Sequence, residues 1–408
     1  MMQGGDGRTL DLDFTSGVLD SRITFSRAST TATYINSSGY VTTASTNIPR
    51  FDYAPDTLAA RGLLIEGQAT NLIYWSEAFD TSGAAINWNW SALNVTRGTA
   101  TTTSPTGSSA TVIKIQETTA TGVHAPLIVY GTLTSSAYTV SLFAKAVERQ
   151  YLQLFDNGGS SANAMFNLSG SGTVVSESTA GIAAITPYPN GWYRISMRTP
   201  TLTNMNIQFR LSTNGTTTSY AGTLNSGCYI WGAQLEAASV ASSYIPTGAS
   251  QVTRNADDAS MTGTAFSSWF NASSGTIQAN FRRRLTSTTG RMVSANDNTA
   301  NNWIELGAST TGRWAIQQGG ASQANIAPGT VAANTDYKIA GAYDTNDAQA
   351  ALGGTLGTAD TSVTVPTVDR LFIGRDSGAS PVYLDGTISR LIYWPFRQPN
   401  ATLQSLTQ

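Results

Sequence analysis

Short segments in which apolar and polar residues alternate recur along the whole chain, and this pattern most constrains its fold. Clear examples are residues 138–144 (YTVSLFA), 151–155 (YLQLF), 192–197 (WYRISM) and 206–211 (NIQFRL). A period of two places alternate side chains on opposite faces of a β-strand. Helical periodicity is scarce, and its best candidate is the stretch 400–406, where Asn400 is placed to cap a short helix. The sequence therefore predicts an all-β protein whose antiparallel sheets each bury one face.

The composition narrows the class of protein. Only 12% of the 408 residues are charged, about half of the ~25% usual in soluble domains, whereas Ser and Thr together occupy 102 positions. A net charge of −2 with a pI near 5.5 provides no basic field, so we expect no nucleic-acid partner. No apolar run approaches the ~18 residues of a membrane span, and the first seven residues lack the features of a secretory signal, so we expect no membrane insertion.

The scarcity of cysteine and histidine excludes several kinds of site. One cysteine, Cys228, allows no internal disulfide and no thiolate zinc site, and we interpret it as a small buried hydrophobe. One histidine, His124, excludes any site with two histidine ligands.

The chain divides into four regions by composition. Residues 1–76 are turn-rich and predict an irregular β segment. Residues 77–245 carry the alternating segments quoted above, and residues 246–262 form a polar connector. Residues 263–408 form a second all-β unit. Several strands at short spacing with little helix predict tandem β-sandwiches.

Eight phrases, in this order along the chain, resemble tailed-bacteriophage and prophage virion proteins. They are 25–34 (FSRASTTATY), 47–53 (NIPRFDY), 62–66 (GLLIE), 70–72 (TNL), 231–236 (WGAQLE), 243–247 (SYIPT), 365–374 (VPTVDRLFIG) and 384–393 (LDGTISRLIY). The resemblance covers essentially the whole chain. It implies a carbohydrate-binding-module-like jelly roll over 77–245 and a concanavalin A-like (laminin-G-like) sandwich over 263–408. Residues 1–76 would then be a virion-attachment or assembly segment.

The same resemblance implies a structural or adhesive role in the virion, as a tail fibre, a baseplate protein or a capsid decoration. The implied partners are other virion proteins and host cell-surface polysaccharide. A homo-oligomer is expected, with a trimer favoured because virion fibres are commonly trimers. Such a protein is made in the bacterial cytoplasm and exposed on the particle.

Catalytic patterns are weak in this sequence. Glycan hydrolysis usually needs two opposed carboxylates, and none of the seven glutamates lies within ten residues of another. The segment around His124 lacks the Gly-x-Ser-x-Gly nucleophile pattern. We therefore predict a non-enzymatic protein, and a glycan depolymerase that joins carboxylates from distant strands remains the alternative.

Sugar binding is the positive prediction from the strand pattern. If Tyr138, Val140, Leu142 and Ala144 face the core, alternation turns the intervening side chains outward. Applied to four strands, this logic yields the candidate glycan-binding residues Phe143, Lys145, Tyr151, Gln153, Trp192, Arg194, Gln208 and Arg210. If the strands share one sheet, these aromatic, amide and cationic groups form a wall suited to a sugar ring.

Two alternatives to the sugar-binding wall stay open. In the first, the purely architectural interpretation, the wall packs against a neighbouring subunit or domain. Alternatively, Trp192 lies in the core and the parity of its strand is reversed. Trp88 and Trp90 share one face of their strand, and we expect at least one of them in the core.

Two further clusters carry weaker predictions. The turns at 297–302 and 344–347 contain Asp and Asn, which are turn formers first and calcium ligands second. We predict no cofactor, with a structural Ca²⁺ as the alternative. The run Arg282-Arg283-Arg284 is interpreted as a solvated strand edge, with contact to an acidic glycan or a partner as its alternative.

Overall fold

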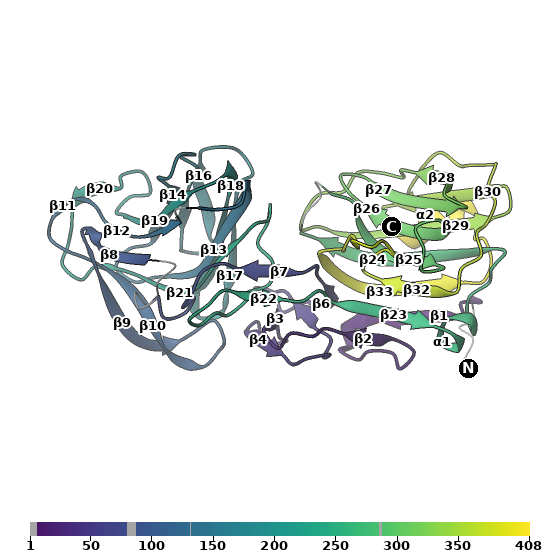
Figure 1. The fold of residues 1–408 in the computed structure, drawn as a ribbon, viewed down its shortest axis with the longest axis horizontal. Helices are drawn as coiled ribbons and strands as arrows, with labels where there is room; N and C mark the ends of the chain where they lie inside the picture. Colours follow the sequence, from purple (N-terminus) through teal and green to yellow (C-terminus); the bar gives the residue numbers. More distant parts are fainter. Residues whose placement is uncertain (1–5, 80–86, 131, 285–287) are drawn as a thin grey trace.

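The computed structural model describes residues 6–79, 87–130, 132–284 and 288–408, and it is built almost wholly of β-strands (Figure 1). Two β-sandwiches lie side by side, and strands from both ends of the sequence meet in one of them. The described residues contain two short α-helices, α1 (Thr264–Ser267) and α2 (Asn400–Thr407). They also contain two 3₁₀ turns, η1 (Phe14–Ser16) and η2 (Pro189–Gly191). The predicted all-β class with tandem sandwiches is confirmed.

The first sandwich is made of two six-stranded antiparallel sheets. Sheet I runs in the order β17 (Ala183–Tyr188), β18 (Trp192–Leu202), β13 (Ser136–Ala146), β21 (Gly227–Glu236), β10 (Ser109–Glu117) and β9 (Val95–Thr103). Sheet II runs in the order β16 (Thr173–Glu177), β15 (Asn163–Asn167), β14 (Tyr151–Asp156), β19 (Met205–Ser212), β12 (Ala125–Tyr130) and β8 (Asn87–Leu93). A small ribbon of β11 (Thr121–Val123) and β20 (Ser219–Ala221) lies at its far end (Figure 1).

The second sandwich is made of an eight-stranded and a seven-stranded sheet. Sheet III runs in the order β31 (Thr355–Leu356), β30 (Asp347–Leu352), β29 (Asp336–Asp344), β24 (Gly275–Arg283), β33 (Gly386–Trp394), β6 (Ala60–Ile65) and β5 (Phe51–Tyr53), and β1 (Leu10–Asp13) also pairs with β33. Sheet IV runs in the order β2 (Thr24–Ser26), β23 (Asp258–Thr262), β32 (Arg370–Ile373), β25 (Gly290–Asn296), β26 (Trp303–Ala308), β27 (Gly312–Gln318) and β28 (Ala321–Ile326).

The N-terminal region does not form a separate unit, contrary to the predicted division at residue 76. Its strands β1, β5 and β6 belong to sheet III, and β2 belongs to sheet IV. In register, Leu10 lies opposite Tyr393 and Leu63 lies opposite Ile388. Both β1 and β6 therefore pair with β33, at different places along its length, and supply hydrogen-bond partners that the 263–408 segment lacks by itself.

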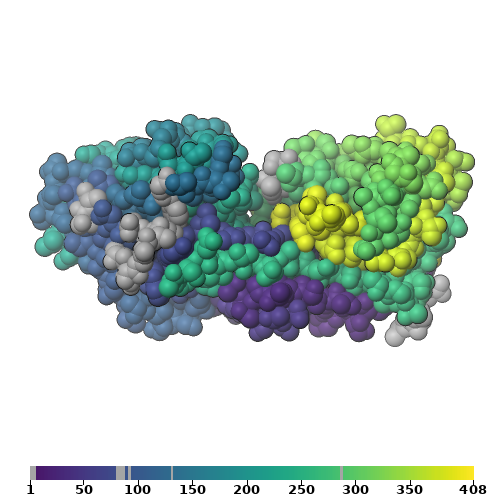
Figure 2. Space-filling view, viewed as in Figure 1, coloured from purple at the N-terminus to yellow at the C-terminus, as the bar shows by residue number. Residues whose placement is uncertain are grey.

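Two small ribbons join the sandwiches. Strand β7 (Ala69–Asn71) pairs with β22 (Val252–Arg254), and β3 (Ala32–Ile35) pairs with β4 (Val41–Ala44). Figure 2 shows a notch between the sandwiches on one side, whereas the N-terminal strands and the segment near residue 250 bridge them on the other. The predicted polar connector at 246–262 thus carries strands of its own.

The core of the first sandwich follows the predicted strand parity. Tyr138, Val140, Leu142 and Ala144 are at most 1% exposed and lie in one cluster with Leu152, Leu154, Tyr193, Ile195, Met197, Ile207, Phe209 and Leu211. Trp88 and Trp90 join the same cluster, which confirms the prediction for at least one of them. Cys228 is buried there too, as predicted, and burial raises the pKa of its thiol to about 12.

Six ionised side chains are buried where the sandwiches meet, and we call them the junction network: Arg27, Arg50, Glu66, Arg254, Asp257 and Arg284. Arg50 lies at the centre, with Nη1 2.6 Å from Glu66 Oε2 and Nη2 2.5 Å from Asp257 Oδ2. Arg27 holds the other oxygen of Asp257 at 3.0 Å. Arg254 and Arg284 both approach Glu66. All of these side chains except that of Arg284 are at most 1% exposed.

The network is completed by hydrogen bonds to uncharged groups. Ser243, which follows the first sandwich, donates its backbone N–H and its hydroxyl to the two oxygens of Glu66, at 2.9 and 2.7 Å. The surplus guanidinium groups donate to carbonyl oxygens; Arg27 reaches those of Ser45 and Ile48, and Arg50 reaches that of Thr33. A buried charge is tolerated when it is paired and hydrogen-bonded. Every ion here has a partner of opposite charge, whereas the Nε atoms of the four arginines have no acceptor among the described residues.

The arginine run at 282–284 is not a solvated edge, so that interpretation is wrong. Strand β24 lies inside sheet III between β29 and β33. Arg283 is 1% exposed and donates to the carbonyls of Leu384 and Thr288, at 3.1 and 3.0 Å, and to that of Ala308. Arg282 pairs with Asp336, and Arg284 reaches the junction network. The three guanidinium groups therefore have three different structural partners.

Replacing the central arginine should destabilise the protein strongly. Arg50→Met leaves Glu66 and Asp257 short of a counter-ion in a buried site, and we expect a loss of about 3–5 kcal/mol in the free energy of unfolding. Urea unfolding followed by tryptophan fluorescence measures it. Arg390→Met, which breaks the exposed pair with Asp11, is the control and should change stability by less than about 1 kcal/mol. Equal effects of the two substitutions would contradict the role given to Arg50.

The network should also make the protein sensitive to acid. Burial alone would raise the pKa of Glu66, but Arg254, Arg284 and Arg50 hold it well below its ordinary 4.5. A depressed folded-state pKa contributes stability above about pH 4.5, and this contribution disappears as the pH falls toward the folded-state value. We expect the urea midpoint to fall below that pH. The Glu66→Gln protein should be less stable at pH 7, and its stability should depend less on pH in the acid range. If its stability depends on pH as strongly as that of the wild type, Glu66 is not a source of the acid sensitivity.

Candidate functional site

The eight candidate glycan-binding residues lie on two sheets rather than one. Four lie on sheet I, namely Phe143 and Lys145 of β13 and Trp192 and Arg194 of β18. The other four lie on sheet II, namely Tyr151 and Gln153 of β14 and Gln208 and Arg210 of β19. The shared core lies between the sheets, so their outward faces point in opposite directions. The single continuous wall expected from the sequence is therefore wrong, although each strand's parity is right.

The sheet I half of the expected wall is largely covered by the chain itself. Phe143 and Trp192 are both 0% exposed and cluster with Val41, Val112, Trp231 and Tyr244. Trp192 Nε1 donates to the carbonyl of Thr103 at 2.8 Å, and Phe143 meets Tyr188 edge-on at 5.0 Å. Val41 of β4 and Tyr244 after β21 supply the cover. Phe143 and Trp192 therefore cannot be sugar platforms. They pack on a neighbouring part of the molecule, which is the alternative to the sugar wall.

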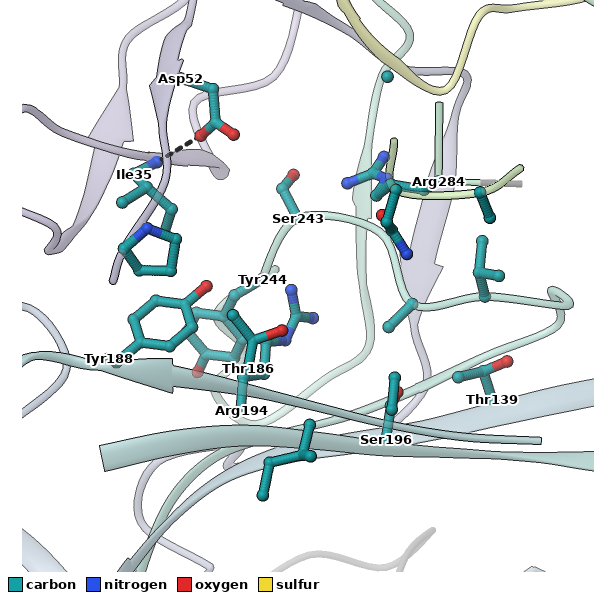
Figure 3. A pocket seen from close by; sticks show the side chains of 18 of the residues that line it. Ile35, Asp52, Thr139, Thr186, Tyr188, Arg194, Ser196, Ser243, Tyr244 and Arg284 are labelled. Atoms are coloured by element: carbon teal, nitrogen blue, oxygen red, sulfur yellow. Dashed lines mark hydrogen bonds between the residues drawn. The ribbon is translucent and has the colours of Figure 1, made fainter. Parts of the chain in front are cut away.

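The two cationic residues of this half remain partly exposed. Lys145 lies opposite Trp192 in register and forms no ion pair with a described residue. Arg194 lies 5.7 Å above the ring of Phe143 and donates from Nη2 to Ser141 Oγ at 3.2 Å. Arg194 lines a cavity between the two sandwiches (Figure 3).

The sheet II half keeps its outward side chains together, and we call this set the outer wall: Tyr151, Gln153, Phe155, Gln208 and Arg210. In register, Gln153 lies opposite Arg210, and Phe155 lies opposite Gln208. All but Gln208 are partly exposed, and Gln208 is 5% exposed. Four predicted residues thus do share one face, together with Phe155, which the same alternation places there.

Arg210 is the distinctive group of the outer wall. Its guanidinium carbon lies 3.5 Å from the centre of the Phe155 ring, and its Nε donates to Gln208 Oε1 at 2.7 Å. Burial lowers the pKa of Arg210, and within the described residues it has no carboxylate partner. Arg375 stacks on Phe372 at a similar 3.6 Å, but two of its nitrogens bind the carboxylate of Asp258. Among the described residues Arg210 therefore lacks the carboxylate partner that Arg375 has.

Two amide oxygens on this side of sheet II are buried without a hydrogen-bond donor in the described part of the chain. They are Gln153 Oε1 and Asn206 Oδ1. Alternation places Asn206 on the same face of β19 as Arg210. The amide nitrogen of Gln153 makes one long contact, 3.5 Å, to Asn163 Oδ1. Leaving a buried acceptor unpaired costs about 1–3 kcal/mol, so a donor that reaches these oxygens gains that much.

Tyr151 is held in place by a tight turn. Gly215 has a φ of +81°, and a Cβ atom there would lie 2.9 Å from the Tyr151 ring. Only glycine combines that backbone conformation with so close an approach. The turn 212–217 therefore packs directly on the ring, which fixes an aromatic group at one end of the outer wall.

Sequence reasoning missed the cavity between the sandwiches. It is lined by side chains from sheet I, from the ribbon β3–β4, and from the Arg61 and Arg284 regions of the second sandwich. In Figure 3, Arg194 and Ser196 of β18 and Thr186 and Tyr188 of β17 face Ser243 and Arg284. These residues are far apart in the sequence, so no local pattern could reveal the site.

The turns considered as calcium sites hold themselves together. Asp297 accepts from the Thr299 N–H at 2.9 Å and from Asn302 Nδ2 at 2.8 Å. Asp344 and Asp347 close the β29–β30 hairpin. Among the described residues no three His, Cys, Asp or Glu side chains gather as a metal site would require. In the same residues the longest helix, α2, has eight residues, and no helix could cross a membrane.

No protein-family model and no curated protein matches the chain. By contrast, 77 chains of solved structures match parts of it, and the following three are among them. The Ruminococcus gnavus IT-sialidase CBM40 bound to α2,3-sialyllactose is 12% identical, with a TM-score of 0.31, covering 35% of this chain and 88% of that chain. Domain 4 of AbnA, a GH43 extracellular arabinanase from Geobacillus stearothermophilus, in complex with arabinotriose, is 10% identical, with a TM-score of 0.31 and coverages of 41% and 82%.

The third structure is the native heptameric SAP-like pentraxin from Limulus polyphemus. It is 13% identical, with a TM-score of 0.26, and the match covers 33% of this chain and 69% of that chain. Each match extends over well under half of this chain. At these identities and TM-scores none of the three carries an argument about what this chain binds.

Trp192 should behave as a structural residue. Trp192→Ala removes a fully buried indole together with its hydrogen bond to Thr103, and we expect the free energy of unfolding to fall by about 3–5 kcal/mol. Lys145→Ala, directly opposite on β13, is the matched control, and its effect should stay within about 0.5 kcal/mol. Urea unfolding measures both; a stable Trp192→Ala protein would show that the indole is not core.

Proposed function

We propose that this chain is a non-catalytic carbohydrate-binding protein of a bacteriophage virion, which attaches the particle to glycan on the host surface. The outer wall is the observation that carries the proposal. It combines a guanidinium group without a carboxylate partner, two aromatic rings and two amide oxygens without donors on one partly exposed sheet face. Sugars are recognised by this combination of apolar ring faces and hydrogen-bonding groups.

The mode of binding follows from the register of the wall. A pyranose ring lies with its C–H face against Tyr151 or the Phe155–Arg210 stack. Its hydroxyls form hydrogen bonds with the partly exposed amide of Gln153, which lies opposite Arg210 in register. Arg210 donates to a ring or hydroxyl oxygen. A shallow face of this size gives modest affinity, and several copies on one particle raise it through avidity.

The virion role is supported by the eight sequence phrases, which span the chain in order. As a tail fibre, baseplate protein or capsid decoration, the protein has other virion proteins and host polysaccharide as partners. A homotrimer presents three outer walls, which suits avidity. The particle surface is its place of action, after synthesis in the bacterial cytoplasm.

The two alternatives make different demands on the structure. A purely architectural virion protein would bury the outer wall against another subunit. A depolymerase would need two free carboxylates across a cleft. Glu66 and Asp257 approach the same Arg50, but both are fully buried and held by arginines. Asp52 and Asp56 both line the cavity between the sandwiches, so chromatography of host polysaccharide after incubation with the protein tests cleavage; shortened products would contradict the non-catalytic proposal.

Substitutions in the outer wall should abolish glycan binding without unfolding the protein. On a glycan array, and then by calorimetry with the best ligand, Phe155→Ala and Arg210→Ala should each weaken binding about tenfold or more, because each removes half of the stack. The matched controls are Phe396→Ala and Arg390→Ala, whose side chains are exposed on the second sandwich, and they should bind normally.

Two results would contradict this assignment. If the intact oligomer binds no glycan on the array, the architectural alternative is favoured. If glycan binds and the outer-wall variants match the controls, the glycan binds at another surface. Circular dichroism of every variant confirms that a loss of binding is not a loss of fold.

A further inference from the structure

We propose that the cavity between the two sandwiches is a second binding site, which takes an oligosaccharide bearing carboxylate groups. This site is separate from the outer wall. The outer wall lies on the outward face of sheet II, whereas the cavity lies against the outward face of sheet I, toward the second sandwich. Its volume is about 580 Å³, far larger than an inorganic anion needs and sufficient for more than one sugar unit.

The charge of the lining points to an anionic ligand. Five arginines line the cavity, namely Arg61, Arg194, Arg198, Arg282 and Arg284, against two aspartates, Asp52 and Asp56. Arg282 and Arg284 are paired with carboxylates outside this lining, so the three other arginines leave a surplus of one positive charge over the two aspartates. Positive charge concentrated in a concave site attracts anions, since low-dielectric walls focus the field.

Three of the five arginines lack a counter-ion. Arg282 pairs with Asp336, and Arg284 pairs with Glu66. Within the described parts of the chain, Arg61, Arg194 and Arg198 form no ion pair. Arg194 makes a single side-chain hydrogen bond, to Ser141, and its Nε is buried without an acceptor. Guanidinium groups bind carboxylates with paired hydrogen bonds, so a carboxylate ligand supplies what these side chains lack.

The remaining lining suits a sugar rather than a simple anion. Thr186, Ser196 and Tyr188 bring hydroxyl groups to the cavity (Figure 3). Burial raises the pKa of Tyr188, so its phenol remains a hydrogen-bond donor at neutral pH. Asp52 accepts from the Ile35 N–H with one oxygen, at 2.7 Å, and its other oxygen accepts no hydrogen bond from a described residue. Hydroxyls and a carboxylate beside an aromatic ring match the alternating polar and apolar faces of a sugar.

The cavity extends far enough for an oligosaccharide. Asp56, Arg61, Arg282 and Thr387 also line a second cavity of about 560 Å³, which continues along the second sandwich to Lys338. The two spaces therefore share lining residues, and Arg61, which forms no ion pair with a described residue, lines both of them. An oligosaccharide with a carboxylate near Arg194 can therefore extend past Arg61 toward the second cavity.

The experiment compares acidic oligosaccharides with their uncharged counterparts on the intact protein. The probes are oligomers of galacturonate and of mannuronate, each with a carboxyl-reduced control, and binding is measured by calorimetry. We expect saturable binding of at least one acidic oligomer, a weakening of at least about tenfold on carboxyl reduction, and weaker binding at high salt. Acetate at the same carboxylate concentration should bind far more weakly.

Substitutions locate the binding. Arg194→Gln and Arg61→Gln should each weaken the acidic oligomer by about tenfold or more, because each removes a charge-assisted contact while keeping a polar side chain. Arg390→Gln, on the exposed surface of the second sandwich, is the charge-matched control and should leave binding unchanged. Circular dichroism excludes loss of fold in each variant.

Three outcomes overturn the inference: no acidic oligomer binds, carboxyl reduction has no effect, or both cavity variants bind as the control does. Phe155→Ala keeps this test apart from that of the outer wall. It should weaken the outer-wall glycan and leave the acidic oligomer unaffected, while Arg194→Gln should do the reverse. Either site can therefore fail while the other stands.

Discussion

The junction network is the constraint on which the arrangement of this molecule depends. Arg50 and Glu66 come from the N-terminal region, Asp257 from the segment after the first sandwich, and Arg284 from the end of β24. All of these ions except Arg284 are fully buried, so removing one of them leaves its partner as an unpaired charge in a low-dielectric site. The network therefore joins the N-terminal region, the segment around β22 and the end of β24, and it reaches the segment after the first sandwich through Ser243. This fits a chain whose N-terminal strands belong to its C-terminal sandwich.

The network also accounts for the unusual balance of basic residues, which is 20 arginines to three lysines. A guanidinium group offers five donors in a rigid plane and stays charged when buried, whereas a buried lysine loses its proton readily. Arg27 uses this geometry to hold Asp257 and two backbone carbonyls together, and Arg283 binds three carbonyls inside sheet III.

The sequence predicted what depends on neighbouring residues and missed what depends on distant ones. Strand parity was right for β13, β14, β18 and β19 because alternation is a local property of the backbone. The pairing of strands is set by long-range contacts, and this pairing divided the expected wall between two sheets. Phe143 and Trp192 have the pattern of exposed platforms, yet β4 and Tyr244 cover them. Half of the candidate wall could be predicted, and the cavity could not, since its lining joins regions more than three hundred residues apart.

The cavity and the junction network are parts of one electrostatic arrangement. Arg284 faces both, pairing with Glu66 on one side and lining the cavity on the other. The network has four guanidinium groups against two carboxylates, so it leaves positive charge next to a cavity that already carries a surplus. An anion bound in the cavity lowers the repulsion among these arginines and contacts both sandwiches. Because a ligand stabilises the state that binds it, such an anion would favour the observed packing of the two sandwiches over any looser one. The mutual orientation of the sandwiches and the occupancy of the cavity are then thermodynamically linked, so the positive charge left by a structural junction becomes a means of recognition.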